Sequence, residues 1–265
     1  MKRYRLLPLA FWVAVAALAT TSCKSIRAKG TVRETVPLEQ PMTMSGVAEQ
    51  VIWHKGFIVS YNESTRLPNW VAYELTADEV AGSVPRARHF DVDPMVNGAQ
   101  ATNEDYRNSG WDKGHIVPAG DMKWDSVAMR ESFYFSNVCP QNHRLNGGDW
   151  RSLEEQCRVY ARQYGRVWIV AGPVVGGNRF GTIGYNRVVV PDAFFKVIMV
   201  KNGDDYVGIG FCFDNEAAGN ARKLSHHAMS IDEVEQLTGL DFFYTLPDSI
   251  EDAMEGRMRL DFWFP

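Results

Sequence analysis

The 265-residue sequence lacks the short motifs of several common enzyme classes. It contains neither GxGxxG nor GxxxxGKS/T, the glycine-rich loops that hold nucleotide phosphates. HExxH and GxSxG, the signatures of zinc peptidases and α/β-hydrolases, are also absent. The four cysteines include no CxxC pair. Nucleotide-cofactor, zinc-peptidase and zinc-ribbon chemistry therefore find no support in the sequence.

Positive charge is not in excess either. The formal net charge is −4, and removal of residues 1–22 would remove Lys2, Arg3 and Arg5 and no acidic residue, which gives −7. Bulk electrostatic attraction therefore does not draw this chain to nucleic acid or to anionic lipid. A binding site for a polyanion would have to be a local basic patch.

A long hydrophobic run of membrane-spanning length is also missing. The apolar run 6–19 has 14 residues, follows three cations and precedes Thr20-Thr21-Ser22-Cys23. A spanning helix needs about 20 apolar residues, so this layout favours a secretory signal. The small residues before Cys23 resemble the lipobox of bacterial lipoproteins, and simple cleavage nearby is the alternative. We expect an exported protein, in the periplasm, anchored to the outer membrane through lipid on Cys23, or secreted.

The rest of the chain divides into a tether and one domain. Residues 23–49 are polar, without a sustained apolar period, and predict a flexible tether. Residues 50–265 carry strand and helix patterns in mixed order, which predicts a single α+β domain with a largely antiparallel central sheet and flanking helices. If Cys23 is lipidated, the remaining three cysteines form at most one disulfide, and buried free thiols are an equal alternative. The predicted strands are 51–61, 70–75, 115–117, 133–138, 167–170, 187–190, 193–200 and 206–213, and the predicted helices are 124–131, 150–164, 217–228 and 231–238.

Two of these helices have clear end signals. In the helix 150–164, apolar residues recur along one face over four turns, with Asp149 as the expected N-cap and Gly165 at the end. The helix 231–238 is preceded by Ser230, with Glu233 three residues later, the pattern of a capping box.

Candidate catalytic residues concentrate in residues 106–120 and 136–154. These segments contain Asp112-Lys113-Gly114-His115, then Asn137-Val138-Cys139-Pro140-Gln141, then Asn146, then Leu153-Glu154. In this order and spacing they resemble the DNA/RNA non-specific endonucleases of the endonuclease G type, which have a ββα-metal active-site motif. Further segments, among them 70–73, 171–173, 190–198 and 230–243, extend the resemblance over about residues 50–250.

The residue types suit phosphodiester hydrolysis, which needs a base for water and a cation for the developing charge. A histidine with a pKa of about 6.5 can accept a proton at neutral pH. The resemblance implies that His115 activates water and that Asn146 holds one Mg²⁺, for which Mn²⁺ can substitute. It further implies that Glu154 orients metal-bound water, and that Asn137 and Asp112 orient the substrate or the side chains that contact it. The family's phosphate-clamping arginine aligns with Arg88, with Arg86 as the close competitor.

Lys113 departs from the family pattern, which has arginine at this position. Lysine keeps the positive charge but loses the planar fork that binds a phosphate or carboxylate through two hydrogen bonds. We expect an altered rate or substrate preference and an unchanged class of reaction.

The sequence therefore predicts an exported, metal-dependent, sugar-non-specific endonuclease that hydrolyses DNA and RNA, and the family resemblance adds a homodimer. The main alternative is a non-catalytic surface lipoprotein of the same fold that binds nucleic acid or a partner protein. A hydrolase of smaller phosphodiesters also remains open, because the net charge is acidic.

Overall fold

The computed structural model describes residues 36–42, 46–216 and 223–265. The predicted signal segment 1–22, Cys23 and the first part of the predicted tether lie outside the described residues. Within the described residues, no helix combines the length and the apolar character needed to cross a bilayer.

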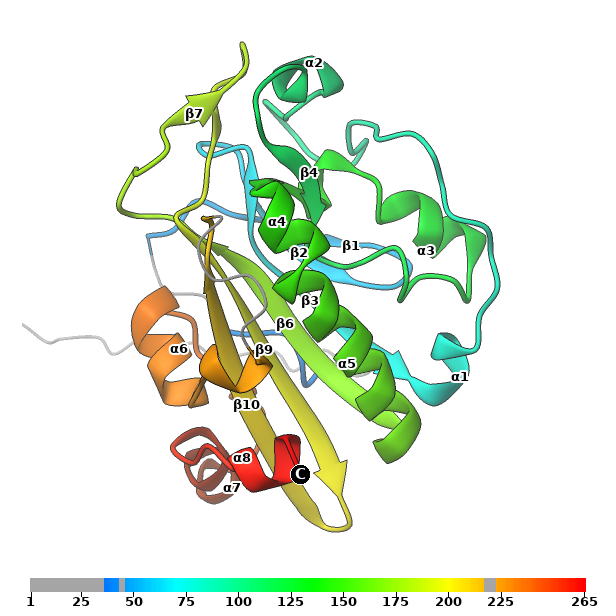
Figure 1. Ribbon diagram of the computed structural model, residues 1–265, viewed down its shortest axis with the longest axis vertical. Coiled ribbons are helices and arrows are strands. Elements are labelled where there is room, and N and C mark those ends of the chain that lie inside the picture. Colours follow the sequence, from blue (N-terminus) through cyan, green and yellow to red (C-terminus); the bar gives the residue numbers. More distant parts are fainter. Residues whose placement is uncertain (1–35, 43–45, 217–222) are drawn as a thin grey trace, which may run out of the picture. The chain divides into compact units, whose positions relative to one another are not determined.

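The central element is a seven-stranded sheet in which every neighbouring pair is antiparallel (Figure 1). This confirms the predicted α+β class with an antiparallel sheet. The strand order is β1-β2-β3-β6-β9-β10-β11. The strands are β1 (Gln50–Trp53), β2 (Ile58–Asn62), β3 (Leu67–Thr76), β6 (Arg166–Val174), β9 (Ala193–Asn202), β10 (Asp205–Asp214) and β11 (Ala228–Met229).

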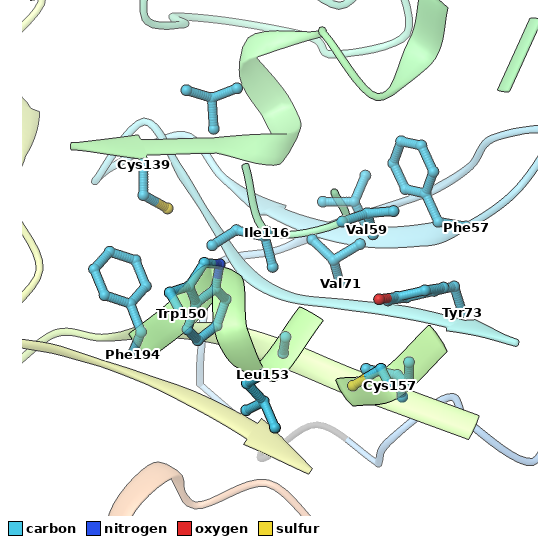
Figure 2. Packing of buried hydrophobic residues seen from close by; sticks show 14 of the residues in the cluster. Phe57, Val59, Val71, Tyr73, Ile116, Cys139, Trp150, Leu153, Cys157 and Phe194 are labelled. Carbon is cyan, nitrogen blue, oxygen red and sulfur yellow. The ribbon is translucent and has the colours of Figure 1, made fainter. Parts of the chain in front are cut away.

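Both faces of this sheet are buried. Side chains alternate between the faces, so that Val71 and Tyr73 of β3 enter one core cluster while Trp70 and Ala72 enter another. Figure 2 shows the first cluster, in which Val71 and Tyr73 lie opposite Trp150 and Leu153. Helix α5 (Asp149–Tyr164) and α8 (Leu260–Trp263) contribute to this first cluster, and α6 (Ile231–Thr238) and α7 (Asp248–Glu255) to the second.

The face with α5 also carries a compact ββα module. Strands β4 (Asp112–His115) and β5 (Val138–Gln141) form an antiparallel pair, followed by α4 (His143–Gly147) and α5. The remaining elements are α1 (Ala77–Val80), α2 (Asn103–Tyr106), α3 (Ser126–Glu131), η1 (Phe135–Asn137), η2 (Leu224–His226) and the small pair β7 (Thr182–Ile183) and β8 (Val188–Val189).

Several predicted boundaries were wrong. The strand predicted at 115–117 lies earlier, at β4, and most of the strand predicted at 133–138 is a turn and 3₁₀ helix, with β5 running through Pro140. Proline fits there because a two-stranded pair leaves one edge without hydrogen bonds. Asp149 is the first helical residue of α5 and not its N-cap, which is Gly148. Gly165 does end the helix, with the positive φ that glycine tolerates.

Two further findings concern the segment 217–228 and the residues before β1. Of the helix predicted at 217–228, residues 217–222 lie outside the described residues, and 223–228 contain η2 and the start of β11 instead. Before β1, Met42 and Asp241 exchange two backbone hydrogen bonds of 2.8 and 3.2 Å. Met42, within the predicted tether, is therefore attached to the loop after α6. The helix 231–238 and its capping box are confirmed.

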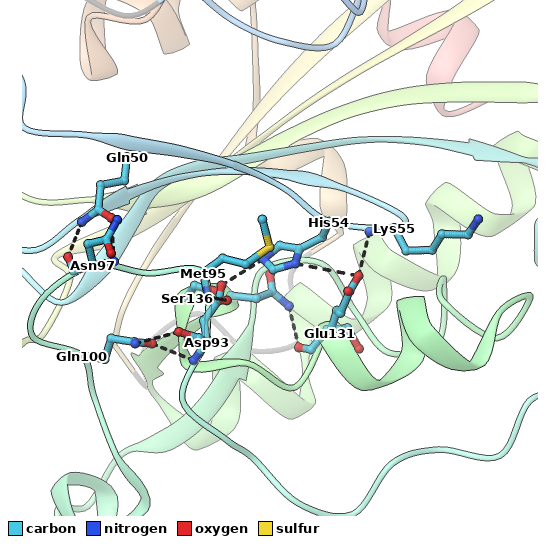
Figure 3. Close-up of polar contacts among 11 residues, drawn as sticks. Gln50, His54, Lys55, Asp93, Met95, Asn97, Gln100, Glu131 and Ser136 are labelled. Atoms are coloured by element: carbon cyan, nitrogen blue, oxygen red, sulfur yellow. Dashed lines mark hydrogen bonds and ion pairs between the residues drawn. The ribbon is translucent and has the colours of Figure 1, made fainter.

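A buried polar cluster fixes the long loop between α1 and α2 (Figure 3). Asp93 accepts a hydrogen bond of 2.6 Å from Ser136 Oγ, lies 3.0 Å from His54 Nε2, and accepts a bond of 2.9 Å from the Met95 backbone N–H. Burial raises the pKa of Asp93, but these hydrogen bonds outweigh burial, so that its pKa lies below the usual value. The cluster joins the β1–β2 turn to the loop that continues along the candidate site.

We expect Asp93→Ala to lower the free energy of unfolding by about 3 kcal/mol, because it leaves buried partners without their charged acceptor. Since the folded-state pKa is lowered, this stabilisation is complete above the unfolded pKa of about 3.9 and is lost as the pH falls below it. Urea denaturation at pH 7 measures the effect. Glu104→Ala, which removes an exposed carboxylate paired with Arg107, serves as control and should change stability by less than about 0.5 kcal/mol. An equal effect of both variants would contradict the role of the cluster.

Candidate active site

His115 ends β4 and lies in a largely apolar pocket. Its side chain packs against Phe133, with ring centroids 4.7 Å apart in an edge-on arrangement, and against Phe90 at 5.1 Å. Its backbone carbonyl accepts a hydrogen bond of 3.2 Å from Trp150 Nε1, which attaches the strand to α5. The residue retains 8% exposure, and its Nε2 atom is buried without a hydrogen-bond partner. This leaves Nδ1 as the ring nitrogen that an incoming water can reach.

The charge state of His115 follows from this pocket. Burial and, to a smaller extent, the positive charge of Arg86 together lower the pKa of His115 to about 3. The imidazole is therefore neutral at physiological pH. A neutral imidazole with a proton on Nε2 carries a lone pair on Nδ1, as a general base requires.

Asp112, at the other end of β4, holds Asn146. Asn146 Nδ2 donates a hydrogen bond of 2.9 Å to Asp112 Oδ2, and the same oxygen lies 2.9 Å from Nδ1 of the exposed His143. Because the amide nitrogen is engaged, the Oδ1 atom of Asn146 is the free end of the side chain and accepts no hydrogen bond from the described residues. An amide whose nitrogen is bound by a carboxylate presents its oxygen in a fixed direction, and such an oxygen suits a hard divalent cation such as Mg²⁺. The residues present therefore fit the predicted metal site.

Gly114, which lies between Asp112 and His115 in the motif, is required for steric reasons. Gly114 pairs with Cys139 across the two strands, and a Cβ atom at Gly114 would collide with Oε1 of the buried Gln141. Any larger residue would push β5 away from β4 and displace Asn146, which follows β5 in the chain.

Glu154 lies on α5 within a group of charged side chains. Burial raises the pKa of Glu154 to about 7; among the cations, Lys196 lowers this pKa most, and Asp121 raises it. Asp121 itself is completely buried and accepts hydrogen bonds of 2.7 Å from Arg158 and 2.8 Å from the Tyr73 hydroxyl. Glu154 therefore lies beside a buried network formed by Asp121, Arg158 and Tyr73.

Asn146 and Glu154 are not on one continuous helix. Glu154 lies eight residues after Asn146 in the sequence. Asn146 belongs to α4, and the backbone of Gly148 breaks the helix before α5 begins. The relation of the two side chains therefore depends on the Gly148 bend and not on helical periodicity.

Arg86 and Arg88, the two candidates for the phosphate clamp, are both exposed and differ in their contacts. The guanidinium of Arg86 lies over the Phe133 ring, 5.0 Å from its centroid, and its charge acts on both His115 and Glu154. Arg88 is exposed like Arg86, but it has no aromatic contact of this kind among the described residues. In an extended loop, residues two apart can differ greatly in distance from a site, which the sequence alone does not show.

Asn137 and Lys113 have different surroundings. Asn137 is completely buried; its side chain accepts a bond of 2.9 Å from the Val117 N–H and donates to the carbonyls of Val117 and Ser132. It thus fixes the segment that follows His115 and does not face substrate. Lys113 is half-buried, donates 2.6 Å to Asn103 Oδ1 and lies over the Phe90 ring.

The sequence reasoning missed Lys196. This lysine is completely buried, its Nζ has no hydrogen-bond partner, and it lies 4.3 Å from the centroid of the Trp150 ring. A signal was present, because Lys196 is the one charged residue within the apolar stretch 193–200. Such a residue in a strand buried on both faces indicates a specific electrostatic role.

Comparisons with known proteins show the family of the chain. A family model described as DNA/RNA non-specific endonuclease matches residues 34–249. The mitochondrial nuclease EXOG of Mus musculus is 36% identical over 206 residues, which are 72% of this chain and 56% of that protein. Nuclease C1 of Cunninghamella echinulata var. echinulata is 34% identical over 212 residues, 75% of this chain and 84% of that protein. The mitochondrial endonuclease G of Bos taurus is 32% identical over 211 residues, 75% of this chain and 70% of that protein.

A solved structure gives the same result. A chain in the crystal structure of the EndoG/EndoGI complex matches with a TM-score of 0.71 and 29% identity, covering 77% of this chain and 89% of that chain. The chain spans 54–62% of the length of the EXOG nucleases that it matches. Since the family model covers most of the domain, including β4, β5, α4 and α5, the chain belongs to the DNA/RNA non-specific endonuclease family.

Proposed function

We propose that this protein is a metal-dependent endonuclease that hydrolyses phosphodiester bonds in both DNA and RNA. The observation that carries the proposal is the neutral His115 in its aromatic pocket, on the same short strand as Asp112, which orients the Asn146 amide. A base and a hard-cation ligand at the two ends of one four-residue strand suit phosphodiester hydrolysis.

Each side chain has a role in this proposal. His115 Nδ1 takes a proton from the attacking water, and the guanidinium of Arg86 binds a phosphate oxygen through its fork of donors. Mg²⁺ or Mn²⁺, held by Asn146, supplies charge stabilisation to the leaving 3′ oxygen when bound. Glu154 orients water on the metal side, and Asp112 and Asn137 position the groups that touch substrate. Lys113 contacts the backbone of the nucleic acid as a point charge.

Lack of sequence preference is part of the proposal. The groups assigned to substrate are cations and a metal ligand, which recognise phosphate, and phosphate contacts carry no base information. The acidic net charge confines attraction to the local patch around Arg86 and Lys113.

The cellular setting belongs to the same proposal. The charged start, the apolar run 6–19 and the small residues before Cys23 support export, with lipid attached to Cys23. Radiolabelled fatty acid would be incorporated by the wild-type chain and not by Cys23→Ser if the anchor exists. Homodimer formation, which the family resemblance implies, is tested by light scattering of the purified protein.

Removal of the divalent metal is expected to abolish cleavage. Purified protein should degrade plasmid DNA and total RNA with Mg²⁺, lose this activity completely in excess EDTA, and regain it when Mg²⁺ or Mn²⁺ is restored. A panel of small phosphodiesters, assayed in parallel, tests the alternative that the protein hydrolyses smaller phosphodiesters. Cleavage of these compounds without cleavage of polymers would contradict the proposal, and inertness with every divalent metal would favour the non-catalytic alternative.

A further inference from the structure

A second group of carboxylates lies far from Asn146 in the fold, between α6 and α7. Asp232 and Glu235 belong to α6, and Glu255 is the last residue of α7. Each of the three offers one carboxylate oxygen, and these oxygens all lie within 4.8 Å of one another. The two helices cover the sheet face opposite to α5, so this cluster is separate from the candidate active site.

Glu255 points into this cluster without a partner. The residue is only 5% exposed, and its Oε1 atom is buried and accepts no hydrogen bond. A buried carboxylate oxygen without a donor costs free energy unless a cation or a proton compensates it. This orphaned oxygen is the observation that distinguishes the cluster from an ordinary acidic surface.

Of the other two carboxylates, Glu235 is held by a hydrogen bond and Asp232 lies beside the end of α7. Glu235 Oε1 accepts a hydrogen bond of 2.8 Å from the Phe242 backbone N–H, which fixes the side chain and leaves its second oxygen available. Asp232 Oδ2 lies next to Gly256, where a Cβ atom would approach it to 3.3 Å. The three groups are therefore arranged by the helix ends and by the loop after α6.

The surrounding charges are also negative. Asp241 and Glu251, which share a hydrogen bond, lie close enough to act on Glu235 and Glu255. Within the described part of the chain, no ion pair includes any of these five carboxylates. In addition, Glu255 ends a helix, where the unpaired backbone carbonyls carry partial negative charge. In the described ranges, no cationic side chain is therefore ion-paired with the cluster.

We propose that Asp232, Glu235 and Glu255 form a structural calcium site that joins α6 to α7. Oxygens on opposite sides of a Ca²⁺ ion lie about 4.6–5.2 Å apart, since each Ca²⁺–oxygen distance is about 2.3–2.6 Å. Because the three oxygens lie within 4.8 Å of one another, all of them can reach one cation of this size. Mg²⁺ needs shorter distances of about 2.0–2.1 Å and a stricter octahedron. Water molecules and carbonyl oxygens at the end of α7 complete the shell of a cation that takes six to eight oxygens.

The competing explanation is a shared proton. Burial and the neighbouring carboxylates raise the pKa of Glu255 to about 9, so in the absence of a cation this group can stay protonated. The two explanations differ in what Ca²⁺ does to the protein. Only a metal site gives a calcium-dependent rise in melting temperature that requires Glu255.

The test measures thermal unfolding of the full-length chain after removal of metals, with and without Ca²⁺. To exclude binding at the active site, the chain carries Asn146→Ala. At Ca²⁺ concentrations about 100-fold above the dissociation constant, we expect Tm to rise by about 5–10 °C. Glu255→Gln in the same chain should lose this rise while its calcium-free Tm stays equal or increases, because the variant removes a buried, repelled carboxylate.

Asp252→Asn is the matched control, since it removes one exposed carboxylate from the same helix outside the cluster. It should keep the full response to Ca²⁺. If Glu255→Gln does not fold, Asp232→Asn at the half-exposed edge of the site provides the same comparison. A chain carrying Asn146→Ala that shows no calcium-dependent rise, or a Glu255→Gln variant with an unchanged rise, would overturn the proposal. Isothermal titration of the Asn146→Ala chain with CaCl₂ should give one site, with Mg²⁺ binding more weakly.

Discussion

Replacement of His115 by alanine is expected to lower kcat for DNA and RNA by about 10²–10⁴-fold, the usual contribution of a positioned general base. The variant should keep its fold, because the lost ring leaves the contacts of Phe133 with Phe90 in place. His226→Ala is the matched control, since His226 is exposed and makes no side-chain contact among the described residues. It should retain wild-type activity. A His115→Ala enzyme within about threefold of wild type would remove His115 from the mechanism.

The pH dependence adds a second check on the same variant. Because burial lowers the pKa of His115 to about 3, the base is already neutral at pH 6 and at pH 8. The ratio of wild-type to variant rate should therefore be the same at both values. For a histidine with its ordinary pKa of about 6.5, the wild-type rate would fall at pH 6 and the ratio would shrink.

The second large effect is expected for Arg86. We expect Arg86→Ala to lower kcat/KM by about 10²-fold, because the variant loses a positive charge that acts on both His115 and Glu154 and binds the phosphate in the transition state. Arg86→Lys should restore only part of the loss, since lysine lacks the planar fork. Single-turnover and steady-state rates on one duplex substrate would measure both.

Arg88→Ala is the matched control for Arg86, because it removes the same charge from the same loop. It should stay within about threefold of wild type. A larger loss for Arg88→Ala than for Arg86→Ala would restore the assignment made from the sequence alignment and contradict the geometry of the Arg86–Phe133 contact.

The parts of the fold that could be predicted are those with a strong local signal. Helix α6 follows from the Ser230 and Glu233 capping box, and α5 from its apolar face and Gly165. The strands β9 and β10 follow from their long runs of β-branched and aromatic residues. Local hydrogen bonding and side-chain periodicity decide these elements, and both can be read from adjacent residues.

The parts that were missed depend on contacts between distant residues. The strand β5 runs through Pro140 because β4 pairs with only one of its edges, and nothing near Pro140 in the sequence indicates this. Likewise Lys196 meets Trp150 only after β9 and α5 have packed. The order of the motifs pointed to His115, Asp112 and Asn146, which the fold places on or beside β4, while the contact of Arg86 with Phe133 could not be read from the sequence.

The described cysteines have a consequence for the conditions under which the domain can fold. Cys139, Cys157 and Cys212 are all free thiols. Burial raises the pKa of Cys157 to about 12 and that of Cys212 to about 11, so almost no thiolate exists at neutral pH. Thiols in this state react slowly with oxidants and disulfides. The described residues therefore contain no disulfide that folding has to form, and we expect the melting temperature of the domain to be the same with and without a reductant.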